Sequence, residues 1–483
     1  MARINTNIPA LQSIRYLQDN YQDLSVRLER LATGLRINRG RDDPAGLIAS
    51  ERLRFEIRAT QQAIENSARA NNVLTTTEGA LTEVNSLLLD LQALIVEASN
   101  KGALTTEEVN ANQLQIDSVL ASIDRISNTT QFGSKKLLDG SQSYTLSTIP
   151  STALANISVF AAQLPQGSGR DVVVTVTQSG QTALLSFVGA TAGTTSTTSA
   201  TTIELQGTIG TEIITFASGA TFSDIKTAIN TQTAATGVSA VLSSPAAGSV
   251  ASAILLNSTT YGSDAFVSVS PITGNFVVNG NGGNVSRAVG VDTGVIVDGQ
   301  AALVKGLRAD VRSSGLDTRL YLTTSFASSL SSATFRITGG GTLFQLTPEV
   351  TPNGQVHVGF NSVRTTQLGN AVVGRLHTLR SGGANDLASQ QFLTSQEIVA
   401  EAIDQVSAYR GRLGNMQRNT IDANVSAQGI ALENVTASES IIRDADMAVE
   451  LSALTRAQIL VQSTQSTLQI ADAVPNLVLS LLG

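Results

Sequence analysis

Two stretches near the ends of the chain carry apolar residues at seven-residue intervals. In residues 11–35, one row consists of Ile14, Tyr21, Leu28 and Leu35, and a second of Leu17, Leu24 and Leu31. Near the C-terminus, the repeating residues are Met447, Leu454, Val461 and Leu468. Leu451 begins a second row there, which Gln458 and Gln465 dilute. Such a repeat makes a narrow helical stripe that is buried only against another helix, so both stretches predict helices that need partners.

The chain beside these stretches also has helical periodicity, interrupted by recognisable stops. Asp43 is a predicted N-cap and Pro44 the first residue of a long helix that runs from 45 to about 99. A capping box from Thr105 to Glu108 predicts a second, shorter helix, and residues 128–140 predict a small β-hairpin. Helical periodicity returns after residue 394. The polar run 443–446 interrupts it, and Pro475 is expected to end the last helix.

Residues 141–394 follow a different pattern, in which apolar and Ser/Thr positions alternate. Residues 172–176 and 334–338 are typical strands, and residues 223–232 predict one helix. A Gly/Asn-rich run at 279–284 suggests a boundary between two small domains. The predicted fold class is therefore α+β. Both termini form a long α-helical coiled coil or bundle, and the central insertion is mostly β.

Charge divides the chain in the same way as the apolar pattern. Residues 1–60 hold ten arginines against seven acids (+3), and residues 395–483 hold five arginines against ten acids (−5). Residues 141–394 hold eleven basic and eleven acidic residues. The two ends are therefore complementary in charge. The net charge of −7 argues against general nucleic-acid binding.

Composition limits the remaining classes of protein. The chain has no cysteine, so it forms no disulfides and has no thiolate metal ligands. We find no apolar run of the roughly 18 residues that a membrane helix needs, and the N-terminus lacks the apolar segment of a cleaved signal peptide. The two histidines, His357 and His377, have no neighbouring ligands, and Gly339–Gly341 is not followed by a phosphate-binding lysine. The sequence predicts no enzyme, cofactor or metal site.

Many short motifs at both ends resemble bacterial flagellin. At the N-terminal end they are residues 27–38, 42–46 (Asp-Asp-Pro-Ala-Gly), 76–81 and 131–133. At the C-terminal end they are residues 410–414, Asn434, Ser438, 442–446 (Ile-Arg-Asp-Ala-Asp), 458–460, 474–476 and 478–482. The resemblance covers about residues 1–140 and 395–483, which is 229 of 483 positions. The insertion has no comparable match, although residues 214–241 resemble a small strand–helix–strand repeat of outer flagellar domains.

The resemblance implies a structural subunit that self-assembles into the helical flagellar filament used for swimming. In that family, residues 1–43 and 447–483 would form the inner core, residues 44–140 and 395–446 a surrounding rod layer, and residues 141–394 the outer region. The resemblance also implies export through the flagellar type III channel without a cleaved signal, and an extracellular location. The implied partners are copies of the same chain, hook-junction and cap proteins, and an export chaperone at the C-terminal helix; no membrane is implied.

The resemblance further concerns recognition by the Toll-like flagellin receptor. The family pattern Gln-Arg-Val-Arg-Glu aligns with residues 89–93, where this chain has Leu89, Asp90, Leu91, Gln92 and Ala93. Because the charges are lost or reversed, we expect weak recognition. Two alternatives remain at this stage: a junction protein between hook and filament, which shares the terminal helices, and a coiled-coil adhesin, which would need a signal peptide or anchor.

Overall fold

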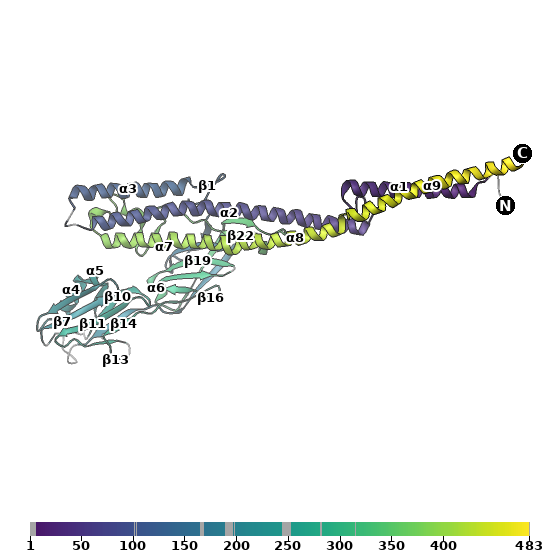
Figure 1. Ribbon diagram of the computed structural model, residues 1–483. Helices are drawn as coiled ribbons and strands as arrows, with labels where there is room; N and C mark the ends of the chain where they lie inside the picture. The colour runs from purple at the N-terminus through teal and green to yellow at the C-terminus, as the bar shows by residue number, and fades with distance from the viewer. Residues whose placement is uncertain are drawn as a thin grey trace. The chain divides into compact units, whose positions relative to one another are not determined.

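The computed structural model describes residues 6–100, 102, 104–164, 169–188, 197, 199–243, 253–280, 283–313 and 315–482 (Figure 1). The side chains of residues 283–284 and 474–482 lie outside this description. The chain forms two compact units. One consists of Met1–Asn71, Gln345–Gln355 and Gln417–Gly483, and the other of Asn72–Phe344 and Val356–Met416.

Long helices occupy both ends of the chain, as the periodicity predicted. The α-helices are α1 (Ile8–Thr33), α2 (Pro44–Ala98), α3 (Thr106–Thr129), α4 (Phe222–Thr231), α5 (Thr233–Thr236), α6 (Thr324–Ala327), α7 (Phe392–Met416), α8 (Ala423–Arg443) and α9 (Met447–Leu482). Shorter turns are η1 (Pro352–Gly354), η2 (Leu376–Leu379), η3 (Leu387–Ser389) and the π-helical η4 (Gln417–Asp422). The predicted helices at 45–99 and 223–232 are confirmed, and so is the capping box of Thr105 and Glu108.

The first unit contains α1, the beginning of α2, α8 and α9. The backbone of α9 stays helical through Pro475, so the expected break there is wrong. Proline fixes φ near the helical value, so it can occupy a helical position, at the cost of its N–H donor and of crowding with the carbonyl group four residues earlier. Residues 477–482 are helical in their backbone, but their side chains lie outside the described residues.

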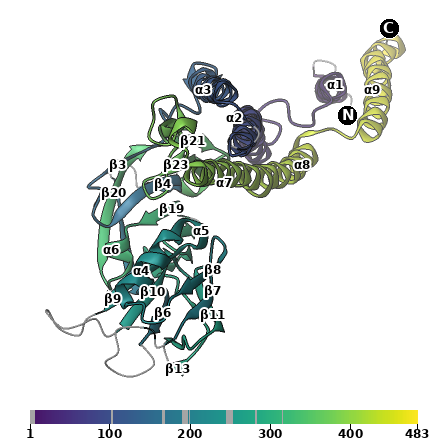
Figure 2. The same ribbon diagram turned by 90° about the vertical axis from the view of Figure 1, so that its left-hand side faces the viewer.

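The helical part of the second unit is built from α2, α3 and α7, which lie side by side (Figure 2). The buried residues of α2 recur three and four positions apart, at Leu74, Thr77, Leu81, Val84, Leu88, Leu91, Ile95 and Ala98. Helix α3 contributes Ile116, Leu120 and Ile123, and α7 contributes Ile398, Ala402, Val406 and Leu413. These stripes form a helix-packing core, as a repeat of this spacing predicts.

Residues 361–390 pack on these helices and not on the outer sheets. The side-chain amide of Gln113 on α3 donates to the carbonyl oxygen of Leu379 at 2.9 Å and accepts from the backbone N–H of Leu387 at 2.9 Å. Asp124 on α3 accepts from the backbone N–H and the hydroxyl of Thr365, each at 2.9 Å. The boundary that we placed at residue 394 is therefore too late, because side chains of α3 satisfy the backbone of this loop.

The insertion holds two β-sandwiches. In the inner one, the sheet β16-β15-β5-β20-β3 faces the sheet β17-β18-β19-β4. Its strands are β3 (Tyr144–Ser147), β4 (Leu154–Ala162), β5 (Arg170–Gln178), β15 (Gly294–Val297), β16 (Gln300–Ala301), β17 (Leu303–Lys305), β18 (Arg308–Arg312), β19 (Leu316–Leu322) and β20 (Ser332–Gly340). Alternate residues of β5 are buried, and Val172 lies opposite Phe335 of β20, as predicted for these two strands.

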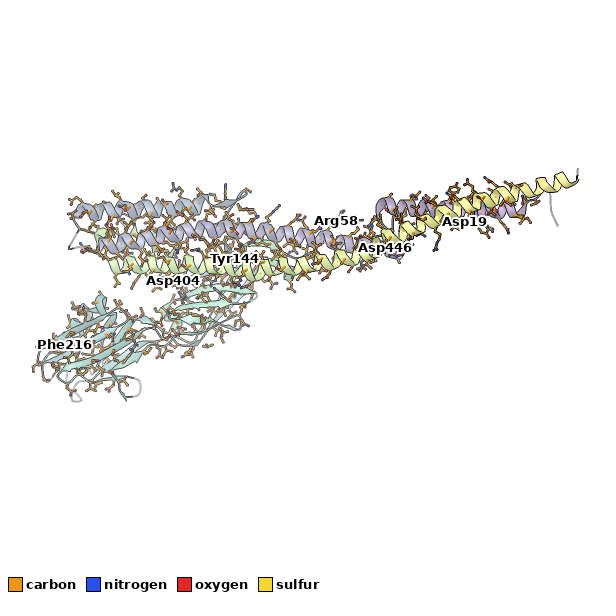
Figure 3. All side chains as sticks on the ribbon, viewed as in Figure 1. Asp19, Arg58, Tyr144, Phe216, Asp404 and Asp446 are labelled. Carbon is orange, nitrogen blue, oxygen red and sulfur yellow. The ribbon has the colours of Figure 1, made fainter. Side chains whose placement is uncertain are left out.

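The outer sandwich stacks the sheet β13-β12-β6-β10-β9 on the sheet β14-β11-β7-β8, and α4 adds to the same core. Its strands are β6 (Thr182–Phe187), β7 (Thr201–Gly207), β8 (Thr211–Phe216), β9 (Val238–Ser243), β10 (Ala253–Tyr261), β11 (Phe266–Thr273), β12 (Val278–Gly280), β13 (Gly283–Asn284) and β14 (Arg287–Val289). Phe216 lies in this core (Figure 3). The short strands β1 (Gln131–Phe132) and β2 (Lys135–Lys136) form the predicted hairpin, and further short strands are β21 (Thr342–Gln345), β22 (Gln355–Val358), β23 (Gly369–Asn370) and β24 (Gly374–Arg375).

In the sequence, the segment that forms the outer sandwich is inserted into the segment that forms the inner one. A single domain boundary near residue 280 is therefore wrong. Residues 183–278 supply the buried outer core, while residues on both sides of them supply the inner core. The chain crosses between the cores at Gln181 and Val291, whose backbones exchange two hydrogen bonds at 2.9 Å. In the Gly/Asn-rich run, Asn279 pairs with Asn284 and Gly280 with Gly283, as the short strands β12 and β13.

A buried arginine connects α7 to the inner sandwich. Arg412 is 6% exposed, donates to Asp310 of β18 at 3.0 Å, and lies 3.7 Å from the ring centre of Phe160 on β4. Its charge is therefore paired at a place where an unpaired charge would cost several kcal/mol.

One expectation about membranes needs correction. Helix α2 contains an 18-residue window of mean hydropathy 1.3, of which 28% is buried, so it passes a test of length and composition for a membrane span. The window contains polar residues, so it is not an uninterrupted apolar run. The long core helix of a helical protein passes the same test.

Candidate assembly surface

Helices α1 and α9 lie against each other in antiparallel orientation (Figure 1). Asn7, just before α1, donates to the carbonyl oxygen of Ala471 at 2.8 Å. At the other end of the pair, Arg27 donates to Glu450 at 3.0 Å. Residue numbers rise along α1 as they fall along α9, so the two helices run in opposite directions.

The inner stripe of α9 has a seven-residue repeat, but its second row differs from the predicted one. The buried residues are Glu450, Leu454, Ala457, Val461 and Ala471, and Thr464 and Leu468 are half-buried. Leu454, Val461 and Leu468 were predicted to belong to the stripe. Gln458 and Gln465 are exposed, so glutamines do not dilute this interface. Small residues in the second row let the partner helix approach closely.

Helix α1, like α9, turns only one of its two predicted rows toward its partner. Its inner face consists of Ala10, Ser13, Leu17, Asn20, Leu24, Arg27 and Leu31, which are buried or half-buried. The row Leu17, Leu24 and Leu31 was predicted. The other predicted row, Ile14, Tyr21 and Leu28, is 40–50% exposed. The polar residues at 20, 27, 450 and 464 find partners across the pair, which explains why they displace apolar ones.

The remaining predicted residues of the stripe lie at the edges of this interface. Met447 is 51% and Leu451 is 55% exposed. Leu35 is half-buried just after α1, where its backbone bridges to Asp444. The structure thus gathers seven predicted residues at the helix pair or beside it, and leaves five on its surface.

Helix α9 also exposes two pairs of apolar residues, Val449 with Leu460 and Ile459 with Ile470, which the sequence analysis missed. Val449, Ile459, Leu460 and Ile470 are 61%, 60%, 43% and 67% exposed. Val449 and Leu460 are eleven residues apart, and so are Ile459 and Ile470. Eleven residues make three turns of an α-helix, so the two members of each pair share a face, and the two pairs lie about 80° apart around the helix axis. An eleven-residue period would have revealed the pairs, whereas a seven-residue period does not.

A buried carboxylate fixes the register of the pair. Glu450 is 5% exposed and accepts hydrogen bonds from Arg27 at 3.0 Å and from Arg30 at 3.1 Å. Burial by itself raises the pKa of Glu450, but the hydrogen bonds from the two arginines outweigh it and hold that pKa below its ordinary value. The same bonds raise the pKa of Arg27. Glu450 is therefore ionised at neutral pH, as a charge-assisted contact requires.

The turn between α1 and α2 explains the Asp-Asp-Pro-Ala-Gly motif. Gly34 ends α1 with a φ of 72°, and Asp42 accepts from the backbone N–H groups of Asn38 and Arg39 at 3.1 and 2.8 Å. The hydrogen bond from the Arg39 N–H has the larger effect, and both bonds lower the pKa of Asp42. Asp43 caps α2 through the N–H of Gly46 at 2.8 Å. A side chain at Gly46 would collide with the Asp43 carboxylate and the buried Ile37.

The segment aligned with the receptor motif lies on α2 in the second unit. Leu89 is 50% exposed, Asp90 and Ala93 are exposed, and Gln92 is half-buried, whereas Leu91 is fully buried. Four of the five side chains can therefore meet a partner from solution. Elsewhere in the described residues, no group of three or more His, Asp or Glu is placed to hold a metal ion.

Comparison with known proteins gives matches at both ends of the chain. Residues 4–143 match the bacterial flagellin N-terminal helical region, and residues 396–482 match the flagellin C-terminal helical region. A flagellin of Clostridium tyrobutyricum is 28% identical over 97% of this chain and 98% of its own length. The flagellin of Bacillus subtilis is 42% identical over 29% of this chain and 46% of its own.

A solved structure of flagellar hook-associated protein-3 from Legionella pneumophila covers 80% of this chain and 97% of its own, at 11% identity and a TM-score of 0.31. Similarity at that level carries no argument for a junction protein. The matches at both ends are to flagellin, and the alignment with a named flagellin runs through the insertion as well. The chain belongs to the bacterial flagellin family and is a structural subunit of the flagellar filament.

Proposed function

We propose that the exposed apolar rows of the α1–α9 pair are the surfaces through which copies of this chain pack into the filament. The observation that carries the proposal is the exposure of large apolar side chains on two helices that are paired with each other. They include Ile14, Tyr21, Leu28, Leu451, Val449, Ile459, Leu460 and Ile470. Apolar surface of this extent gains free energy when a neighbouring copy removes it from water.

The two rows differ in chemistry, which favours an open polymer. The row on α1 contains the aromatic Tyr21, whereas the exposed apolar residues of α9 are aliphatic. Contact between unlike surfaces of identical chains is heterologous, and a heterologous contact that does not close produces a helical filament. The predicted self-assembly residues thus act at two levels: Leu17, Leu24, Leu31, Leu454, Val461 and Leu468 join α1 to α9, and the exposed ones join copies.

We assign the domains accordingly. Residues 1–43 and 447–483 form the inner core of the filament. Residues 44–140 and 395–446 form the rod layer, to which we add residues 361–390 because they pack on α3. The two sandwiches face outward, where an insertion can vary without disturbing assembly.

We further propose that the subunit functions outside the cell after export without a cleaved signal. Its partners are the hook-junction and cap proteins at the ends of the filament and an export chaperone on α9. An unassembled α9 exposes Val449, Ile459 and Ile470, and a chaperone that covers them would keep copies apart before export.

The test is polymerisation of purified variants, followed by sedimentation and negative-stain microscopy. Ile459→Lys and Tyr21→Lys place a charge on the exposed rows and should abolish filaments while leaving the helix content of the monomer unchanged. Ile213→Lys is the matched control, because Ile213 is 64% exposed on β8 of the outer sandwich. Filaments of normal yield from both row variants would refute the proposed surface.

A further inference from the structure

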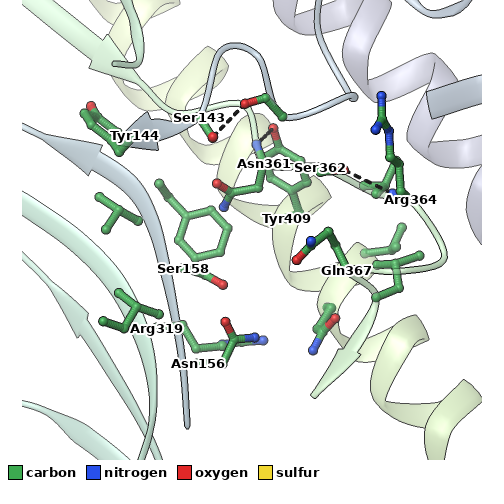
Figure 4. Close-up of a pocket in the computed structure, with 18 of the residues that line it drawn as sticks. Ser143, Tyr144, Asn156, Ser158, Arg319, Asn361, Ser362, Arg364, Gln367 and Tyr409 are labelled. Carbon is green, nitrogen blue, oxygen red and sulfur yellow. Dashed lines mark hydrogen bonds between the residues drawn. The ribbon is translucent and has the colours of Figure 1, made fainter. Parts of the chain in front are cut away.

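A cavity of about 420 Å³ lies in the second unit, between the inner sandwich and the helices (Figure 4). Strand β4, strand β19, the loop 361–368 and helix α7 each contribute to its wall. Strand β4 is the last strand of its sheet, so one of its edges faces this space. The volume is within the range of small-molecule sites and holds one or two sugar rings.

Uncharged polar side chains surround the cavity. Asn156 and Ser158 from β4, together with Asn361 and Gln367 from the loop, point toward a common centre (Figure 4). The Nδ2 of Asn361 is buried and has no hydrogen-bond partner among the residues that the structure describes. A buried donor without a partner costs free energy, and a ligand or water oxygen at this place would remove that cost.

Most charged groups of the wall are engaged elsewhere. Arg319 donates to Asp310 at 2.8 Å, and Arg364 donates to Asn128 at 2.6 Å with its guanidinium turned away from the amides (Figure 4). The buried Nε of Arg364 has no hydrogen-bond partner among the described residues. Asp139 accepts from the backbone N–H of Ser141 at 2.9 Å. A ligand in this cavity therefore meets mainly amides and hydroxyls, which act as both donors and acceptors.

Four aromatic residues belong to the wall: Tyr144, Phe160, Tyr321 and Tyr409. Phe160 and Tyr409 have ring centres 5.9 Å apart, and the hydroxyl oxygen of Tyr409 accepts from the backbone N–H of Asn361 at 3.1 Å. Burial raises the pKa of Tyr409, so the phenol keeps its proton and can donate it. Rings beside paired donors and acceptors suit molecules that have both C–H faces and hydroxyl edges.

We propose that this cavity binds a neutral carbohydrate of one or two hexose units. The hydroxyl groups of a sugar donate and accept in equal measure, which matches Asn156, Asn361 and Gln367 better than it matches an anion or a cation. The sugar could be free or the end of a larger glycan, and the two sources share this chemistry.

The test uses full-length monomer and a panel of glucose, galactose, mannose and N-acetylglucosamine, each as the free sugar and as the methyl glycoside. Saturation-transfer NMR identifies binders, and calorimetry gives the dissociation constant. We expect saturable binding of at least one sugar at about 1 mM or tighter. Binding of the free sugar but not of the glycoside would identify a free ligand; binding of both would identify the end of a glycan.

Variants decide whether the cavity is the site. Asn156→Ala and Asn361→Ala should each weaken binding at least tenfold, and Asn434→Ala on α8, which is exposed, should leave it unchanged. Asn361→Ser and circular dichroism separate lost binding from lost folding. A panel in which no sugar binds, as expected for a cavity filled by water alone, would overturn the proposal. So would binding that both cavity variants leave intact.

Discussion

The carboxylate of Glu450 and the guanidinium of Arg27 lie 3.0 Å apart across the α1–α9 pair, although 423 positions separate them in sequence. Arg30 donates to the second oxygen of the same carboxylate at 3.1 Å. One acid near the start of α9 thus neutralises much of the positive charge at the end of α1. This ion pair is one specific contact between the two ends of the chain, whose net charges are +3 and −5.

Glu450→Gln should weaken filaments at neutral pH by up to about 3 kcal/mol per subunit, because two partly buried arginines lose their anion. The pKa of Glu450 in the folded chain lies below its ordinary value. The ion pair therefore gives its full stabilisation when the pH is above the ordinary pKa of a glutamate. Its contribution is lost as pH falls below the ordinary range of a glutamate and through the lowered pKa. Thermal disassembly of filaments at several pH values measures this. Glu433→Gln, at an exposed position of α8, is the control, and equal loss in both variants would contradict the role of Glu450.

The α1–α9 pair should be disordered in the free monomer and ordered in the filament. Several residues of its inner face are small, among them Ala10, Ser13 and Ala457, whereas ordering each residue costs about 1–2 kcal/mol of backbone entropy. Hydrogen exchange should therefore be fast across 447–470 in the monomer and slow after polymerisation. Residues 398–413 of α7 serve as an internal reference that stays protected in both states. Slow exchange at 447–470 before polymerisation would sink the prediction.

The outer sandwich should be removable. Its two connections meet at Gln181 and Val291, which are hydrogen-bonded neighbours, so excision of residues 182–290 with a short Gly-Ser linker leaves the inner core intact. We expect the shortened chain to fold and to form filaments, as checked by circular dichroism and electron microscopy. Excision of residues 361–390 is the contrasting variant. It should unfold the helical part, because α3 loses its partners for Gln113 and Asp124.

Receptor recognition should be weak and should be restored by returning the charges of the motif. Leu89→Gln, Asp90→Arg, Gln92→Arg and Ala93→Glu change four accessible residues of α2 and leave the buried Leu91 in place. The combined variant should activate receptor reporter cells more strongly than the unchanged monomer. Glu83→Arg, an exposed charge change on the same helix, should not. A strong response to the unchanged monomer would contradict the alignment.

Gly46→Ala should destabilise the start of α2. The new methyl group would displace the Asp43 carboxylate, which costs about 1 kcal/mol for the lost cap, and would press on Ile37 from 2.7 Å. Gly79→Ala is the matched control in the same helix, because nothing lies within 4 Å of its added methyl group. That change should stabilise by about 0.5–1 kcal/mol. Thermal unfolding of both variants compares them, and an equal gain in stability would show that the turn tolerates a side chain at 46.

Local signals in the sequence were sufficient for the elements and for the family. Caps such as Asp43 and Thr105 fix where helices begin, because the bonds that they make span only three residues. Alternation in β5 and β20 likewise predicted strands that the sandwich contains. The motifs at both ends indicated flagellin, and the family matches at residues 4–143 and 396–482 confirm it.

Tertiary structure decided which face each helix buries and which segments share a core. The heptad rows of α9 are compatible with Leu451 or with Ala457 inside, and only the arginines of α1 select the face that carries Glu450. The nesting of one sandwich in the other depends on the contact of Gln181 with Val291, 110 residues apart, and the cavity depends on Asn156 and Asn361 meeting. Such contacts leave no periodic trace in sequence, because packing across the fold creates them after local structure is already determined.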